Sequence, residues 1–313
     1  MKLRENPSMG RKVFFINPPF KLSSLIIPEL RKEEYEIYEL KDYQHAKSIL
    51  QLFPESICFL NIDEDLTPTE WFNFVRSFGA NDTLKTIHLG VISIESLTWV
   101  KELFLIHTNM PCGFISATSS KAQLIETITA ILDINGAKGQ RKYVRADCKE
   151  DTKIYATCLV SGITVKLEIR NISTVGFCCT APLASQKLFS INLVVRRLVL
   201  CIHDKEIITN AAVIAVKVEG DHLMIVLLFL QGISFTAKQN IRNYVTAFLQ
   251  RSISIITQNI PLDTTDYSII PDESKNEVNE LEELEEIVSN DSDDTIKNQT
   301  VFDKSDLNTT KLF

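Results

Sequence analysis

The stretch that decides the fold runs from residue 141 to residue 176 and reads RKYVRADCKEDTKIYATCLVSGITVKLEIRNISTVG. It opens with two arginines four residues apart, Arg141 and Arg145, and it closes with the segment Asn171 to Gly176. Between them, apolar and β-branched residues alternate with polar ones, which is typical of half-buried strands. The stretch therefore predicts β-structure with a basic arm before it and a polar turn after it.

The strand pattern continues to residue 229 without a good helix. The strand candidates are Thr152–Leu159, Thr164–Arg170, Gly176–Thr180, Phe189–Cys201, Ile207–Val218 and Leu223–Phe229. Short turns such as Ser161-Gly162 join them, which favours a small six-stranded antiparallel barrel. Residues Thr236–Gln250 then predict one helix, because Ile241, Val245, Phe248 and Leu249 form an apolar stripe.

Arg-x-x-x-Arg at residues 141–145 and Asn-x-Ser-x-x-Gly at residues 171–176 resemble the two signatures of the PilZ family. Members of this family are bacterial receptors for the second messenger cyclic di-GMP. The resemblance covers residues 138–252 and includes the order of the six strands and the terminal helix. It implies cyclic di-GMP as the ligand, held by Arg141, Arg145, Asn171, Ser173 and Gly176, with Gln140, Lys142 and Arg170 as further candidates.

The chemistry of these side chains suits a cyclic dinucleotide, which presents two phosphates and two guanines. A guanidinium group can hold phosphate oxygens in pairs or donate to the O6 and N7 edge of guanine. Asn171 and Ser173 are two residues apart and would share one face of a strand. Gly176, which lacks a Cβ, would permit a positive φ or close approach of the ligand. Asn171 stands where many members carry aspartate, and a neutral acceptor weakens binding by about 1 kcal/mol.

Residues 10–135 follow a different pattern, in which short apolar strands alternate with amphipathic helices. The strand candidates are Lys12–Asn17, Glu34–Leu40, Ser56–Ile62, Thr86–Ile92 and Pro111–Ser116. The helix candidates are Lys21–Lys32, Asp42–Leu52, Thr67–Phe78, Ile94–Thr108 and Ser119–Ile134. Crossovers of one helix each imply a parallel sheet covered on both faces. The fold class is therefore multidomain, with a flavodoxin-like, receiver-type (βα)5 domain before the barrel.

This first domain resembles a response-regulator receiver that lacks the residues for phosphorylation. Asn17-Pro18-Pro19 stands where a receiver carries its acidic pair, and Asn61 stands at the position of the phospho-acceptor aspartate. Only Ser93 matches the pattern, at the end of the fourth strand. A hard divalent cation prefers carboxylate oxygens, so no metal site is expected. The resemblance implies a pseudo-receiver used for contact with a protein partner or with a second copy.

Composition gives the remaining expectations. From Pro261 to the end there are 15 acidic and 4 basic residues, so residues 259–313 are expected to form an acidic, disordered tail. Residues 1–260 carry a net charge of +4, too little for binding to a nucleic-acid polymer. Seven cysteines with irregular spacing and no signal peptide favour the cytoplasm. The longest apolar run, Leu223 to Leu230, is too short to span a bilayer.

These observations predict three parts: a pseudo-receiver at 10–135, a PilZ domain at 136–258 and the tail at 259–313. The leading interpretation is a receptor without catalytic activity or cofactor, in which cyclic di-GMP orders the Arg141–Arg145 linker and changes the domain arrangement. A nucleotide-independent adaptor, using the pseudo-receiver and the tail to bind a protein partner, is the alternative. A phosphorylated response regulator is a third reading, which Asn61 disfavours.

Overall fold

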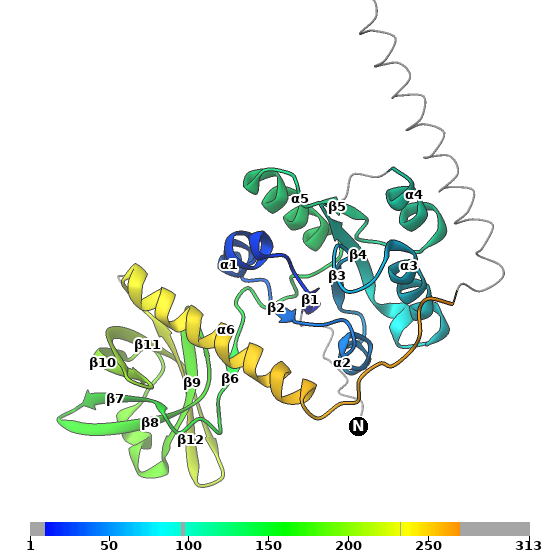
Figure 1. Cartoon of the computed structure of the whole chain (residues 1–313). Helices are drawn as coiled ribbons and strands as arrows, with labels where there is room; N and C mark the ends of the chain where they lie inside the picture. The colour runs from blue at the N-terminus through cyan, green and yellow to red at the C-terminus, as the bar shows by residue number, and fades with distance from the viewer. Residues whose placement is uncertain (1–9, 95–97, 232, 270–313) are drawn as a thin grey trace, which may run out of the picture. The chain divides into compact units, whose positions relative to one another are not determined.

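The structure is a computed structural model that describes residues 10–94, 98–231 and 233–269 (Figure 1). Its strands are β1 (Val13–Ile16), β2 (Ile37–Leu40), β3 (Ile57–Asn61), β4 (His88–Ser93), β5 (Phe114–Ser116), β6 (Ala146–Asp147), β7 (Ile154–Val160), β8 (Ile163–Ser173), β9 (Gly176–Pro182), β10 (Val194–Ile202), β11 (Lys205–Glu219) and β12 (His222–Phe229). Its α-helices are α1 (Ile27–Lys32), α2 (Ala46–Leu52), α3 (Pro68–Ser77), α4 (Thr98–His107), α5 (Lys121–Ile134) and α6 (Phe235–Thr257). None of the helices within these ranges combines the length and apolar character needed to cross a membrane.

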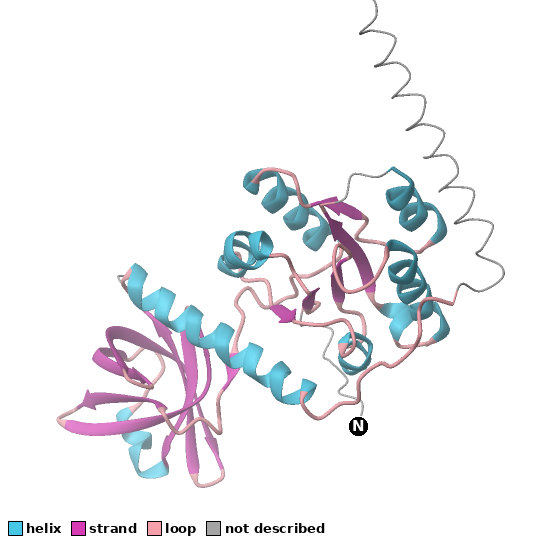
Figure 2. Ribbon diagram, viewed as in Figure 1, coloured by secondary structure: helices cyan, strands magenta, loops and turns pink. Residues whose placement is uncertain are grey.

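The first five strands form one sheet in the order β2-β1-β3-β4-β5. The pairs β3–β4 and β4–β5 are parallel, and helices flank the sheet (Figure 2). All five residues of β3 are buried, as expected for a strand covered on both faces. This strand order is that of flavodoxin-like folds, so the predicted class of the first domain is confirmed.

The strands β7 to β12 close into an antiparallel barrel. Their order is β8-β7-β10-β11-β12-β9, and pairing of β8 with β9 closes the ring. Burial alternates along β7, where every second residue faces the core. The predicted six-stranded barrel is confirmed. The strand predicted from Phe189 begins only at Val194, because a 3-10 helix (Leu183–Leu188) and a turn precede it.

Helix α6 lies across the barrel and covers part of its core (Figure 1). Ser234 caps its first turn by accepting a hydrogen bond from the backbone N of Ala237. Ile241 and Val245 are buried in the barrel core, as the apolar stripe predicts. The helix continues past Gln250 to Thr257, because Ile253 extends the buried face.

The chain divides into two compact units. The barrel unit contains residues 10–14, 20–39 and 132–261, and the other unit contains residues 15–19, 40–131 and 262–269 among those described. Helix α1 and the turn that follows it thus belong to the same unit as the barrel. This grouping matters for the site, because Glu34 lies in that turn.

Residues 262–268 pack against α2 and α3 of their own unit, although they belong to the predicted tail. The ring of Tyr267 is buried against Phe74, and the backbone carbonyl of Tyr267 accepts from Asn73 Nδ2 at 2.8 Å. The carboxylate of Asp263 pairs with Lys47 Nζ at 3.3 Å. The expectation of disorder is therefore wrong for this segment, because one aromatic ring and one ion pair anchor it. The tail beyond residue 269 lies outside the described residues.

Replacing Asp263 with asparagine should lower the free energy of unfolding by roughly 1 kcal/mol at neutral pH. Burial works against the charged carboxylate, but hydrogen bonds from Thr265 and Tyr267 and the charge of Lys47 outweigh it and lower the pKa of Asp263 from 3.8 to about 2. A depressed folded-state pKa gives stability that is complete above pH 3.8 and is lost as pH falls towards 2.

The measurement is denaturant unfolding of the full chain at pH 7 and at several values below pH 4. The difference between the wild type and Asp263→Asn should shrink as the pH falls. Asp82→Asn is the control, because the side chain of Asp82 is fully exposed in the same unit. A difference between the wild type and Asp263→Asn that stayed constant down to pH 2 would contradict the assignment.

Candidate functional site

The two predicted motifs meet through a short backbone pairing. Strand β6 follows Arg145 directly and pairs antiparallel with β8, so that Ala146 lies opposite Ile172 and Asp147 lies opposite Asn171. Arg145, one residue earlier, therefore stands at the position facing Ser173. Sequence reasoning did not predict β6, which is only two residues long. This pairing brings the arginine segment and the polar turn together.

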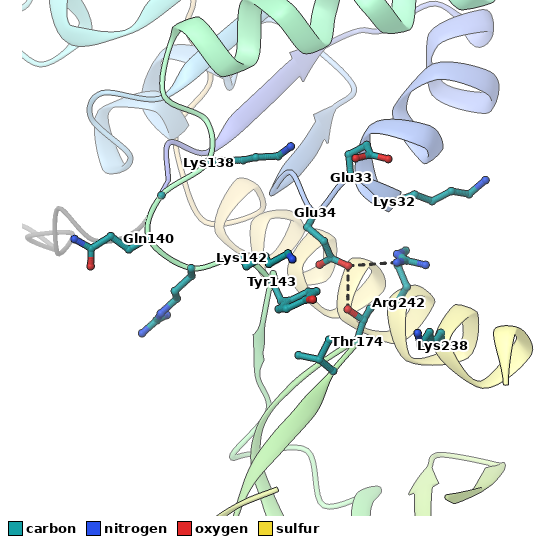
Figure 3. Close-up of a pocket in the computed structure, with 13 residues that line it drawn as sticks. Lys32, Glu33, Glu34, Lys138, Gln140, Lys142, Tyr143, Thr174, Lys238 and Arg242 are labelled. Carbon is teal, nitrogen blue, oxygen red and sulfur yellow. Dashed lines mark hydrogen bonds and ion pairs between the residues drawn. The ribbon is translucent and has the colours of Figure 1, made fainter. Parts of the chain in front are cut away.

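A hollow of about 530 Å³ is lined by residues 138–143 of the linker and by Thr174 and Val175 of the turn between β8 and β9 (Figure 3). We call it the linker hollow, and it is lined by Lys32, Glu33, Glu34, Lys138, Gly139, Gln140, Arg141, Lys142, Tyr143, Thr174, Val175, Lys238 and Arg242. All of these residues belong to the barrel unit. Six of the side chains are basic and two are acidic, so the hollow suits an anion. Its volume falls within the range typical of small-molecule sites.

Three of the predicted residues, Arg141, Gln140 and Lys142, line the linker hollow. The side chain of Gln140 points away from Glu34 (Figure 3). Arg145 is exposed and does not line this hollow. The two arginines of the motif thus face different surroundings, although only three residues separate them.

Arg145 instead stands beside β8, one residue before β6. Burial raises the pKa of the Cys178 thiol, and the charges of Arg170 and Arg145 partly oppose this rise. Arg170 also pairs with Glu219 at 3.2 Å. Asn171 lies directly opposite Cys178 in the strand pairing. The strand registers therefore make Arg145, Arg170 and Asn171 neighbouring positions on the barrel wall.

A β-bulge places Arg170 and Asn171 in this arrangement. In the pairing with β9, Ile169 lies opposite Cys179 and Asn171 lies opposite Cys178, so Arg170 is the extra residue. A groove of about 420 Å³ runs beside it, lined by Lys149, Glu168, Ile169, Arg170, Thr180, Glu219 and His222. The sequence contains no clear signal for the bulge, because Arg170 and Asn171 fit the alternating pattern equally well.

Ser173 and Gly176 have structural contacts of their own. Ser173 follows the core residue Ile172 in β8, so alternation along the strand directs its side chain to the other face. Only 4% of Ser173 is exposed, however, and its hydroxyl donates to the carbonyl of Gly176 at 3.1 Å. Gly176 does not have the positive φ that was considered for it. A Cβ there would lie 2.2 Å from the carbonyl oxygen of Leu227, so the neighbouring strand explains the glycine.

Glu34 is a residue of the site that sequence reasoning missed. It comes from the turn after α1, and its carboxylate points toward Thr174 and Arg242 (Figure 3). It accepts from Thr174 Oγ1 at 2.9 Å, from Arg242 Nη2 at 3.3 Å and from the backbone N of Val144 at 3.1 Å. These partners lie more than a hundred residues away along the chain, and no local pattern marks the contact.

At the carboxyl edge of the five-stranded sheet, the polar groups bind one another. Asn61, at the end of β3, donates from Nδ2 to the carbonyl of Asn17 at 2.9 Å. The carboxylate of Asp63 accepts from the hydroxyl of Ser93 and from the backbone N of Ile94. Within the described residues, no group of three histidine, cysteine, aspartate or glutamate side chains is arranged to hold a metal ion.

No protein-family model matches the sequence, and no curated protein is significantly similar to it. Among solved structures, the chain is similar to the PilZ domain with c-di-GMP of YcgR from Escherichia coli, at 12% identity and a TM-score of 0.33 over 39% of this chain and 99% of that one. It is also similar to the Bacillus subtilis inhibitor of motility MotI/DgrA, at 18% identity and a TM-score of 0.30 over 36% and 52%. A third is the Borreliella burgdorferi PlzA protein in complex with c-di-GMP, at 16% identity and a TM-score of 0.27 over 41% and 49%. The chain spans about half the length of the last two.

These likenesses are distant and are confined to a minor part of the chain. The closed six-stranded barrel, the terminal helix and the two motifs are features of the chain itself. Taken together, in this order, they resemble the arrangement of a PilZ domain, and they follow an α/β domain of flavodoxin-like strand order.

Proposed function

We propose that this protein is a non-catalytic receptor for cyclic di-GMP, which binds where the linker meets the turn. The observation that carries the proposal is the β6–β8 pairing, because it places the Arg141–Arg145 segment beside the Asn171–Gly176 segment. Arg141 would bind a phosphate from the linker hollow. Arg145 and Asn171 would bind the guanine edge at the barrel wall, where Arg170 adds a second guanidinium group.

The proposal gives different roles to the other predicted residues. Ser173 keeps free acceptor lone pairs on its hydroxyl oxygen, because the one hydrogen bond that it makes among the described residues is one that it donates. Gly176 would act indirectly, by letting β9 approach β12 and so fixing the turn. Gln140 and Lys142 line the linker hollow and would contact the phosphates of the ligand. The functional consequence would be an ordered linker and an altered surface for a protein partner.

Titration of the full chain with cyclic di-GMP should give a binding heat and a rise in the melting temperature. A ligand that binds only the folded state stabilises it by about 2.7 kcal/mol at a concentration one hundred times its Kd. Cyclic di-AMP is the control ligand, because it has the same two phosphates and lacks the O6 acceptor of guanine. Neither heat nor a thermal shift with cyclic di-GMP would favour the nucleotide-independent adaptor. Equal responses to both ligands would contradict guanine recognition.

A further inference from the structure

The carboxylate of Glu34 joins three segments that meet at the site. One oxygen accepts from Thr174 of the turn and from Arg242 of α6, and the other accepts from the backbone N of Val144 in the linker. The side chain of Glu34 is 13% exposed and that of Arg242 is 19% exposed, so water competes little for these bonds. We refer to these three contacts as the Glu34 latch.

The backbone of Glu34 adopts a conformation that usually belongs to glycine, which indicates that the side chain of Glu34 is needed at this position. Glu34 follows the C-cap Glu33 of α1 and has a φ of 64°, in the left-handed region. Glycine or asparagine usually fills this position after a helix, because other residues are strained there. A strained conformation persists where surrounding contacts compensate for it, and the Glu34 latch supplies them.

The latch also holds the linker in an arrangement that separates the two motif arginines. Arg141 lines the linker hollow, whereas Arg145 does not line it and stands at the position facing Ser173. The backbone N of Val144, between the two arginines, is bound to Glu34. If one compact dinucleotide is to contact both guanidinium groups, this segment must rearrange, and the bond from Val144 would then break.

Arg242 is the other group that the latch engages. Its Nη2 donates to Glu34, but its Nε is buried without a hydrogen-bond partner among the described residues. A buried guanidinium nitrogen without an acceptor is unfavourable, so Arg242 has unused capacity for an anion. Carboxylate and phosphate oxygens both accept hydrogen bonds from a guanidinium group. Arg242 also lines the same hollow as Arg141.

We propose that Glu34 is an internal competitor of the ligand: its carboxylate occupies Arg242, Thr174 and the linker, and a phosphate of cyclic di-GMP displaces it. Arg242 then becomes a phosphate-binding residue contributed by the terminal helix. The proposal rests on the proposed function and adds a regulatory contact to the same site. It also gives the ligand a way to act on the segment after α1, because Glu34 is released when the phosphate binds.

Two variants break the latch in different ways. Glu34→Gln leaves one acceptor oxygen in place of two and removes the charge that holds Arg242. Glu34→Gly removes the whole side chain, and it should still fold because glycine adopts the φ of 64° without strain. Glu206→Gln is the matched control, since Glu206 is exposed on β11 of the same barrel, does not line the linker hollow, and its replacement changes the net charge by the same amount. All four proteins are used as full chains.

Calorimetry should show that Glu34→Gln and Glu34→Gly each bind cyclic di-GMP at least about fivefold more tightly than the wild type, a coupling at the lower end of the usual allosteric range. Glu206→Gln should bind within twofold of the wild type. If the wild type binds and both Glu34 variants bind equally well or more weakly, the proposal that Glu34 competes with the ligand is wrong. Glu34 would then be a residue that preorganises the linker.

A measurement without ligand separates this inference from the proposed function. Amide hydrogen exchange over residues 138–146 should be faster in Glu34→Gly than in the wild type and in Glu206→Gln, because the amide of Val144 loses its acceptor. Faster exchange with no cyclic di-GMP binding by any of the proteins would reject the proposed function while leaving the latch in place. Unchanged exchange would reject the latch itself, whatever the ligand does.

Discussion

The substitutions Arg145→Ala and Arg141→Ala should each weaken the binding of cyclic di-GMP at least tenfold, which corresponds to about 1.4 kcal/mol. Each substitution removes a planar, permanently charged group that can donate two parallel hydrogen bonds to a phosphate or to guanine. Both side chains are exposed, and neither makes a hydrogen bond or ion pair among the described residues. The loss should therefore appear in affinity and leave the melting temperature without ligand unchanged.

The measurement is isothermal titration calorimetry on the full chain, with thermal unfolding as the folding check. Arg196→Ala is the matched control, because Arg196 is an exposed arginine on β10 of the same barrel. It should bind as the wild type does. Unchanged affinity in both Arg141→Ala and Arg145→Ala would falsify the assignment of the motif. Equal losses in all three variants would indicate a general effect of charge.

Substitution of the two arginines is expected to change the preference for the base of the ligand to different extents. Arg145 is placed near Asn171 and Arg170, which the proposed function assigns to guanine, whereas Arg141 lines the basic linker hollow. Arg145→Ala should therefore reduce the preference for cyclic di-GMP over cyclic di-AMP, and Arg141→Ala should weaken the binding of any cyclic dinucleotide. The same titrations, repeated with the second ligand, provide this comparison.

Much of the fold was predictable because it follows from the local periodicity of apolar residues along the sequence. Strands with a period of two and turn residues such as Ser161-Gly162 specify antiparallel neighbours, and the barrel has the six strands expected. Crossovers of one helix specify a parallel sheet in the same way. The start of β10 was predicted too early, at Phe189, because an apolar side chain in a turn looks like the beginning of a strand.

The site was predictable only in part, because its decisive contacts are not local. The motifs identify the arginine segment and the turn, but nothing in the sequence shows that Glu34 binds both. Nor does it show the bulge at Arg170, which depends on the register with β9. Pairs that are far apart in the chain are set by tertiary packing, which the alternation of apolar and polar residues does not encode.

Gly176 shows how a motif residue can be identified correctly and its role assigned wrongly. The resemblance nominates it as a ligand-binding residue, and the absence of a Cβ suggested close approach of the ligand. In the structure the close approach comes from β12: Gly176 lies opposite Leu228, and a Cβ would stand 2.2 Å from the carbonyl oxygen of Leu227. Real Cβ atoms are not found so near a backbone oxygen, so the two strands would have to separate.

Gly176→Ala should therefore destabilise the barrel by about 3 kcal/mol, the upper part of the range for overpacked substitutions. The atom that the new methyl group meets is backbone, which cannot move aside as a side chain can. Differential scanning calorimetry of the full chain measures the loss, and amide hydrogen exchange in β9 and β12 assigns it to the barrel. Gly79→Ala is the control, because a Cβ at Gly79 would have no heavy atom within 4 Å.

The same variant separates the two explanations for this glycine. If Gly176 serves the packing of β9 on β12, the stability falls, and the protein that remains folded loses affinity only because the turn at Ser173 shifts. If Gly176 instead provides space for the ligand, cyclic di-GMP binding is lost while the melting temperature stays close to that of the wild type. The close approach to Leu227 favours the first outcome, since a backbone oxygen already fills the space that a ligand would need.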